Sequence, residues 1–263
     1  MAKIGLVLGA VGTAALIGVS AHAEERTISF DVDGSSVIGT LKTPMGEPAP
    51  VVLLLHGFTG TRDELPIEGT EEGVFARTAR LLAEAGYASL RIDFRGSGES
   101  EMAWADTTFS GQIADAIAAV DWLGEEASVD GNRVAVLGWS QGGLVASHVA
   151  QQRPDIDTLL LWAPVVHPLH TYEALLGAET VASALAAEPE AEIMATLPWG
   201  AETVLKAKFY QEMAATSPIA AVASYAGPVK VIVGSNDTIV APQPASGSAA
   251  RAEATVSAPN KAS

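Results

Sequence analysis

Residues 133–143 read RVAVLGWSQGG, an apolar run that ends in a glycine-rich turn around Ser140. Gly138 and Gly142 stand two positions before and two positions after the serine, in the pattern G-x-S-x-G. Between a strand (133–139) and a helix (141–152), this pattern predicts a sharp turn that raises the serine hydroxyl above the strand ends. The helix N-terminus there favours negative charge. The stretch therefore indicates a nucleophilic serine, and the alternative is a tight glycine turn whose serine is idle.

Strands and helices alternate on both sides of this turn. From apolar periodicity and turn residues we expect further strands at 27–33, 36–42, 50–55, 87–93, 158–162 and 229–234 and helices at 72–85 and 111–123. The first two strands form a hairpin across the Asp33-Gly34 step. The alternation predicts the α/β class, with a mostly parallel sheet covered by helices on both faces.

Residues 165–224 break this alternation and are interpreted as a mainly helical insertion, a lid between two strands. Ordinary surface helices are the alternative. The larger apolar residues of this segment predict either a hydrophobic acyl pocket or the lid's own core; they are Met194, Trp199, Phe209, Tyr210 and Met213.

Composition excludes several classes of protein. The 263 residues include 48% apolar residues and no cysteine, which argues against a disordered chain, a disulfide scaffold, a zinc–thiolate site and a cysteine nucleophile. Fifteen Lys and Arg against 31 Asp and Glu give a net charge of −16, which disfavours nucleic acid as a partner. No helix pairs histidines at i, i+4 and no carboxylates have calcium-loop spacing, so neither a metal nor a cofactor is expected.

The first 23 residues read as a signal peptide. Lys3 precedes an uncharged run from 4 to 19, and Ala21 and Ala23 form an A-x-A cleavage pattern around His22. We expect cleavage after Ala23, a periplasmic or secreted protein, and no membrane association afterwards. An uncleaved anchor is the alternative, but the run is shorter than the roughly 20 apolar residues that span a bilayer.

The loop after the strand at 50–55 is expected beside Ser140, because parallel strands present their C-terminal ends at one edge of the sheet. Acyl transfer needs two N–H donors for the developing oxyanion, and the backbone amides of Phe58 and Gln141 are the candidates. His56 ends its strand and is expected to hold this loop. Asp93, at the end of the strand at 87–93, is likewise expected to brace a loop by hydrogen bonds.

Four motifs, in this order and spacing, resemble the α/β-hydrolase family and most of all its branch of feruloyl and cinnamoyl esterases: HGFTG (56–60), DFRGSGES (93–100), GWSQGG (138–143) and GSND (234–237). The resemblance covers residues 24–240. It implies an α/β-hydrolase fold with an eight-stranded sheet, a lid after the sixth strand and a Ser–Asp–His triad. Ser140 matches the nucleophile and Asp237 the acid. The implied activity is serine-dependent hydrolysis of small carboxylic esters through an acyl-enzyme intermediate.

The triad pattern lacks its histidine. The five histidines are His22, His56, His148, His167 and His170, and none follows Asp237. His167 and His170 follow the strand at 158–162 on the active edge, which makes them the candidates for a relocated base, because a triad is defined by geometry and not by chain order.

The C-terminal residues 241–263 contain 8 Ala, 4 Ser and 3 Pro and a single large aliphatic residue, Val256. This composition predicts a disordered tail, which would leave the strand at 229–234 as an open edge. We hypothesise from this that the chain is a truncated or frame-shifted esterase with impaired turnover. A non-catalytic binding protein on a hydrolase scaffold is the alternative.

Overall fold

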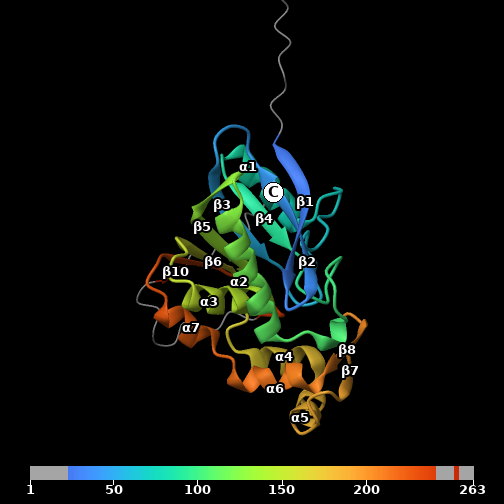
Figure 1. The fold of residues 1–263 in the computed structure, drawn as a ribbon. Coiled ribbons are helices and arrows are strands. Elements are labelled where there is room, and N and C mark those ends of the chain that lie inside the picture. The colour runs from blue at the N-terminus through green and yellow to red at the C-terminus, as the bar shows by residue number, and fades with distance from the viewer. Residues whose placement is uncertain (1–22, 241–251, 255–263) are drawn as a thin grey trace, which may run out of the picture.

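A computed structural model describes residues 23–240 and 252–254, and its centre is an eight-stranded sheet in the order β1-β2-β4-β3-β5-β6-β9-β10 (Figure 1). The strands are β1 (Glu24–Val32), β2 (Ser35–Thr43), β3 (Ala49–Leu55), β4 (Ala88–Ile92), β5 (Val129–Trp139), β6 (Thr158–Trp162), β9 (Val229–Ile232) and β10 (Ala252–Ala254). The hairpin β1–β2 and the pair β2–β4 are antiparallel. All remaining pairs are parallel, so the predicted mostly parallel sheet is confirmed.

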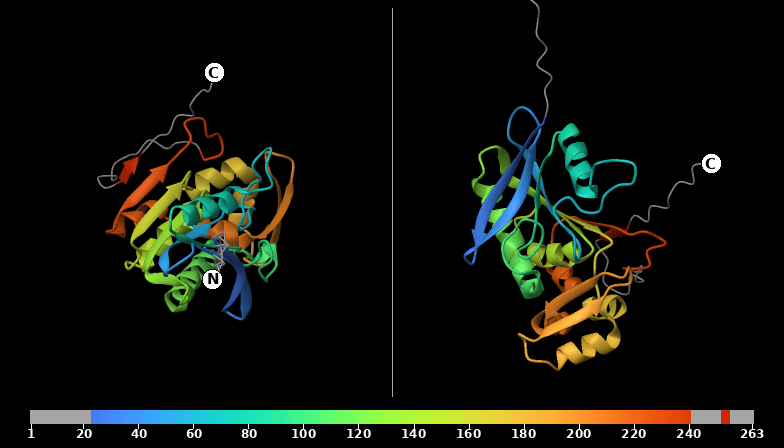
Figure 2. Two further views of the ribbon diagram at one scale, coloured as in Figure 1. Left: turned by 90° about the horizontal axis from the view of Figure 1, so that it is seen from above. Right: turned by 90° about the vertical axis from the view of Figure 1, so that its right-hand side faces the viewer.

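The helices lie on both faces of this sheet and at one end of it. They are α1 (Val74–Glu84), the 3-10 turn η1 (Trp104–Asp106), α2 (Phe109–Glu125), α3 (Gln141–Gln152), α4 (Pro168–Leu176), α5 (Ala178–Leu185), α6 (Ala207–Ala215) and α7 (Pro218–Ser224). Helix α1 covers one face, whereas α2 and α3 lie side by side on the other. The elements between α4 and α6 gather at one end of the sheet, away from α1 (Figure 2).

The two faces of the sheet are packed unequally. Alternate strand residues such as Leu53 and Val136 point toward α2 and α3 and belong to the large apolar core. On the α1 side the fully buried cluster is small and centres on Leu54 and Phe75. Trp139, Leu160 and Trp162 pack against this second cluster but stay partly exposed. The sheet is therefore completely covered only on the side of α2 and α3.

Residues 165–224 contain helices, as expected, and also an antiparallel hairpin that the sequence did not predict. Its strands are β7 (Glu192–Thr196) and β8 (Glu202–Lys206). Helix α7 packs on α3 and not on the other helices of this segment. We call residues 165–215, from the end of β6 to the end of α6, the insertion.

The sheet continues beyond β9, which corrects one expectation. Strand β10 pairs in parallel with Val229–Val231 of β9, so β9 is not an open edge along these three residues. The predicted signal peptide and most of the predicted disordered tail lie outside the described residues. Within the part that the structure describes, no helix is long and apolar enough to cross a membrane.

Candidate active site

The turn between β5 and α3 forces Ser140 into an unusual backbone conformation. Its backbone dihedral angles, φ +55° and ψ −115°, are a combination that a residue with a side chain rarely adopts. The flanking glycines make this turn possible. A Cβ on Gly138 would lie 2.1 Å from the carbonyl oxygen of Gly142, and a Cβ on Gly142 would lie 2.0 Å from that of Leu55. The predicted need for side-chain-free positions on both sides of the serine is confirmed.

Ser140 is anchored by its backbone while its side chain stays free. Its amide donates to the carbonyl of Trp162 (2.9 Å), and its carbonyl accepts from the amide of Val165 (3.0 Å). These bonds tie the turn to the end of β6 and to the first residue of the insertion. Within residues 23–240 and 252–254 the half-buried Ser140 hydroxyl makes no hydrogen bond, so it is available to a ligand.

His56 holds the loop that follows β3. Its buried ring donates through Nδ1 to the carbonyl of Gly57 (2.8 Å) and accepts through Nε2 from the amide of Phe94 (3.2 Å). Burial lowers the pKa of His56 to about 4, so the ring is neutral at physiological pH. With both nitrogens engaged by backbone, His56 cannot serve as a base without leaving these partners. Its expected structural role is confirmed.

The same bonds orient the peptide group between Gly57 and Phe58. The carbonyl of Gly57 accepts from His56 and also from the amide of Gly60 (3.1 Å). Because the carbonyl and the N–H of one planar trans peptide point in opposite directions, these bonds fix the direction of the Phe58 N–H. Gly57 itself lies beside the nucleophile, since a Cβ placed on it would be 3.4 Å from the Cβ of Ser140. Phe58 is the next residue of this loop, and its role as an oxyanion donor stays a prediction.

Glu64 is a residue of this site that sequence reasoning missed. Its carboxylate accepts a hydrogen bond from the amide of Gly57, and burial raises the pKa of Glu64 to about 7. Its Oε1 lies 3.4 Å from the position that a Cβ on Gly57 would take. Glu64 adopts a positive φ of 60° in an irregular loop. No periodicity or motif in that loop singles out this carboxylate among its acidic neighbours.

Gln141, the other candidate oxyanion donor, is the first residue of α3. Amides in the first turn of a helix have no intrahelical acceptor, so the Gln141 N–H is available at the end of the helix next to Ser140. The positive end of the helix dipole also lies there and favours a negative charge next to Ser140. Phe58 and Gln141 thus belong to two different elements that both adjoin Ser140 or its neighbour Gly57, and their role as oxyanion donors stays a prediction.

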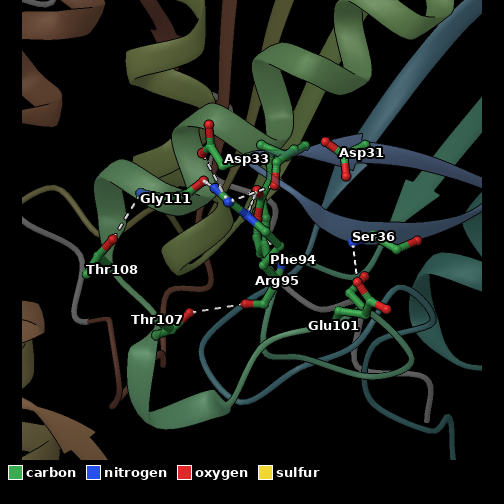
Figure 3. A network of polar contacts seen from close by, with 12 residues as sticks. Asp31, Asp33, Ser36, Phe94, Arg95, Glu101, Thr107, Thr108 and Gly111 are labelled. Atoms are coloured by element: carbon green, nitrogen blue, oxygen red, sulfur yellow. Dashed lines mark hydrogen bonds and ion pairs between the residues drawn. The ribbon is translucent and has the colours of Figure 1, made fainter.

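A polar network braces the loop after β4 (Figure 3). Arg95 donates from its amide to Asp115 (2.8 Å), forms a buried ion pair with the same carboxylate and reaches the carbonyl of Val32 (3.0 Å). Burial raises the pKa of Asp115, although Arg95 opposes this shift. Asp93 accepts from the backbone amides of Arg62 (2.7 Å) and Glu99 (2.9 Å). The expected bracing role of Asp93 is confirmed.

The remaining triad candidates do not meet in this structure. The carboxylate of Asp237 accepts from the amides of Ile239 and Val240 (both 2.9 Å), which closes a local turn. His167 precedes the first turn of α4 and His170 lies within it, and both are exposed. Among the described residues no hydrogen bond joins a histidine to Asp237 or to Ser140, and no group of three or more His, Asp or Glu could hold a metal ion.

A cleft of about 520 Å³ opens beside loop 56–60. Its walls come from Thr59 and Gly60, from Ser97 in the loop after β4, and from Trp104 and Trp199. Trp199 stands at the tip of the β7–β8 hairpin with 57% of its surface exposed. The buried residues of the insertion, Phe209, Tyr210 and Met213, belong instead to the large apolar core, where the ring of Phe209 packs against Phe58 and Phe109. The cleft therefore lies beside the loops that follow β3 and β4, and Ser140 is not among the residues that line it.

Comparison with known proteins agrees with this geometry. Residues 50–179 match the sequence model of the alpha/beta hydrolase fold family. The chain has the α/β-hydrolase fold. The chain superposes with a TM-score of 0.70 on Est1E from Butyrivibrio proteoclasticus, solved with bound ferulic acid, at 24% identity over 88% of this chain and 89% of that one.

Curated relatives of the chain align over shorter segments. Esterase LipI of Mycobacterium tuberculosis is 32% identical over 157 residues, which are 54% of this chain and 45% of LipI. The acylamino-acid-releasing enzyme of Arabidopsis thaliana is 33% identical over 114 residues, 42% of this chain and 14% of that enzyme. The chain thus spans about half or less of the length of the curated relatives that it matches.

Proposed function

We propose that this protein hydrolyses small carboxylic esters through an acyl-enzyme intermediate on Ser140. The strained serine between a strand and a helix N-terminus carries this proposal, because such a turn presents a hydroxyl to a substrate carbonyl. Backbone amides of Phe58 and Gln141 then stabilise the oxyanion. The name of one relative, Esterase LipI, aligned at 32% identity over 45% of its length, supports the reaction class.

The proposed reaction starts when Ser140 Oγ attacks the ester carbonyl carbon and the carbonyl oxygen becomes an oxyanion. The proton of the hydroxyl goes to a base and then to the leaving alcohol, and water later releases the acyl group as a carboxylic acid. We propose His167 or His170 as this base. Both follow Val165, whose amide donates to the carbonyl of Ser140, and their place on the segment next to the nucleophile supports this proposal.

The cleft beside loop 56–60 is the proposed place for one side of the ester. Its size of about 520 Å³ suits a small molecule, and its mixed walls of indole rings and hydroxyl groups suit a partly apolar one. From the predicted signal peptide we propose a periplasmic or secreted enzyme, and the net charge of −16 argues against nucleic acid as a partner.

A second candidate function is ligand binding without turnover. It is favoured by one observation: the carboxylate of Asp237 is engaged by its own turn, and among the described residues no histidine is hydrogen-bonded to it or to Ser140. Without a base, only the oxyanion donors and substrate binding would accelerate the reaction.

The two functions are separated by hydrolysis of p-nitrophenyl acetate. We expect turnover by the wild type, loss of it in Ser140→Ala, and loss in one of His167→Ala and His170→Ala. His148→Gln, in the interior of α3, serves as the matched histidine control and should keep its activity. Folded wild type that gives no turnover above the Ser140→Ala background would favour the binding protein. Turnover that survives both histidine substitutions would show that neither residue is the base.

A further inference from the structure

Tyr172 of α4 is a residue of the insertion that contacts both candidate oxyanion residues. Its hydroxyl donates to the side-chain oxygen of Gln141. Its ring packs edge-on against Phe58, with 5.3 Å between ring centroids. One side chain of the insertion thus touches the two residues whose amides flank Ser140.

The contact continues into the body of the protein. The side-chain nitrogen of Gln141 donates to the side-chain oxygen of Gln112 on α2 (2.6 Å). Gln141 therefore carries one hydrogen bond toward α4 and another toward α2, while its own backbone begins α3. Tyr172, Gln141 and Gln112 are at most 2% exposed. In this apolar setting each lost partner leaves a buried polar group unsatisfied, so the network strongly favours one arrangement.

The surroundings keep the tyrosine in its donating state. Phe109 and Phe209 pack on its ring at centroid distances of 5.7 Å and 5.4 Å. Burial among these rings raises the pKa of Tyr172 well above its usual value of 10, so the hydroxyl keeps its proton. The hydrogen bond from the Tyr172 hydroxyl fixes the Gln141 side chain. The tyrosine ring limits where Phe58 can move.

We propose that Tyr172 is a positioning residue through which the docked insertion sets the geometry of the oxyanion hole. This inference rests on the proposed function and adds to it a role for the lid that does not involve covering the substrate. Donors misplaced by about 1 Å can cost on the order of a hundredfold in rate. Removal of a whole oxyanion donor costs about a hundredfold to a thousandfold in kcat.

The chain offers a matched pair of substitutions. Tyr172→Phe removes only the hydroxyl that bonds Gln141 and keeps the aromatic packing. Tyr210→Phe removes a buried hydroxyl of the insertion that has no hydrogen-bond partner among the described residues. We expect Tyr172→Phe to lower kcat for p-nitrophenyl acetate by about tenfold or more, with KM within about twofold, because the donors act mainly on the transition state. Tyr210→Phe should change neither constant.

Both variants are measured well below their thermal midpoints, so that the folded fraction is the same. A Tyr172→Phe enzyme that loses thermal stability but keeps its kcat would overturn the proposal and leave Ser140-dependent hydrolysis intact. Equal losses in both variants would also overturn it. If Tyr172→Phe does not fold, Gln112→Met cuts the same network at its other end and should show the same loss of kcat. A wild type without turnover would refute the proposed function itself and this proposal with it.

Discussion

The carboxylate of Glu64 accepts the backbone N–H of Gly57, directly before the peptide group that presents the Phe58 amide. His56 holds the carbonyl of the same glycine from the other side. Gly57 is thus fixed through both of its backbone polar groups while it lies against Ser140. An acidic and a basic side chain, both with strongly shifted pKa values, thereby support the loop without belonging to a triad.

The raised pKa of Glu64 makes stability depend on pH in a defined direction. The pKa of Glu64 is about 7 in the folded protein against an ordinary 4.5. Between pH 4.5 and pH 7 the carboxyl is therefore protonated in the folded protein and ionised in the unfolded chain. Stability should fall as pH rises from 4.5 to 7, by at most about 3 kcal/mol. Glu64→Gln removes this pH dependence of stability, because the amide does not titrate. In urea unfolding, the free energy of unfolding of the variant relative to that of the wild type should be higher at pH 8 than at pH 5.

The titration of His56 changes stability in the opposite direction, but its effect cancels when the wild type is compared with Glu64→Gln. Its pKa of about 4 means that stability is lost as pH falls from 6.5 toward 4, when the unfolded state takes up a proton first. Both proteins contain His56, so the difference between them isolates Glu64. An equal gap between the two proteins at both pH values would contradict the buried carboxyl.

The turn around Ser140 should not tolerate a methyl group. Gly142→Ala would place a Cβ 2.0 Å from the backbone oxygen of Leu55, and we expect a loss of about 3 kcal/mol in unfolding free energy. Gly124→Ala is the control, because nothing lies within 4 Å of its Cβ position in α2. It should stabilise the protein by about 0.5–1 kcal/mol. Chemical denaturation of both variants tests this, and a mild effect of Gly142→Ala would show that the turn relaxes.

The buried ion pair behind loop 93–101 should be far more sensitive than a surface pair. Asp115→Asn leaves the Arg95 guanidinium without its buried partner, for an expected loss of about 3 kcal/mol. Asp121→Asn breaks the pair with Arg153, in which the Asp121 side chain is 66% exposed, and should cost less than about 1 kcal/mol. Thermal or urea unfolding measures both losses, and similar values for the two variants would argue against a buried network.

The parts of the fold that could be predicted from sequence are those with a strong local pattern. The run Pro50–Leu55 is apolar without interruption because β3 is buried on both faces, and the structure places β3 at Ala49–Leu55. The hairpin β7–β8 was missed for the opposite reason. Its five-residue strands are short and mostly half-exposed, so neither alternation nor apolar content distinguishes them within a segment rich in Ala and Glu.

Some residues of the candidate site could likewise be predicted from sequence, and others could not. Gly138, Ser140 and Gly142 were predictable because the turn itself requires them. The contact of Tyr172 with Gln141 spans 31 residues and the contact of Glu64 with Gly57 lies in an irregular loop, so neither follows from periodicity. The role of Asp237 and the identity of the base stay predictions.

The most direct test of the account is the mass of the intact protein after incubation with a fluorophosphonate, which reacts with activated serine hydroxyls. We predict one adduct on the folded wild type, its absence in Ser140→Ala and its retention in Ser147→Ala, because the buried Ser147 hydroxyl of the same helix is bonded to the carbonyl of Gly143 (2.7 Å). Folded wild type without an adduct, or an adduct that persists in Ser140→Ala, would contradict the claim that Ser140 is the nucleophile.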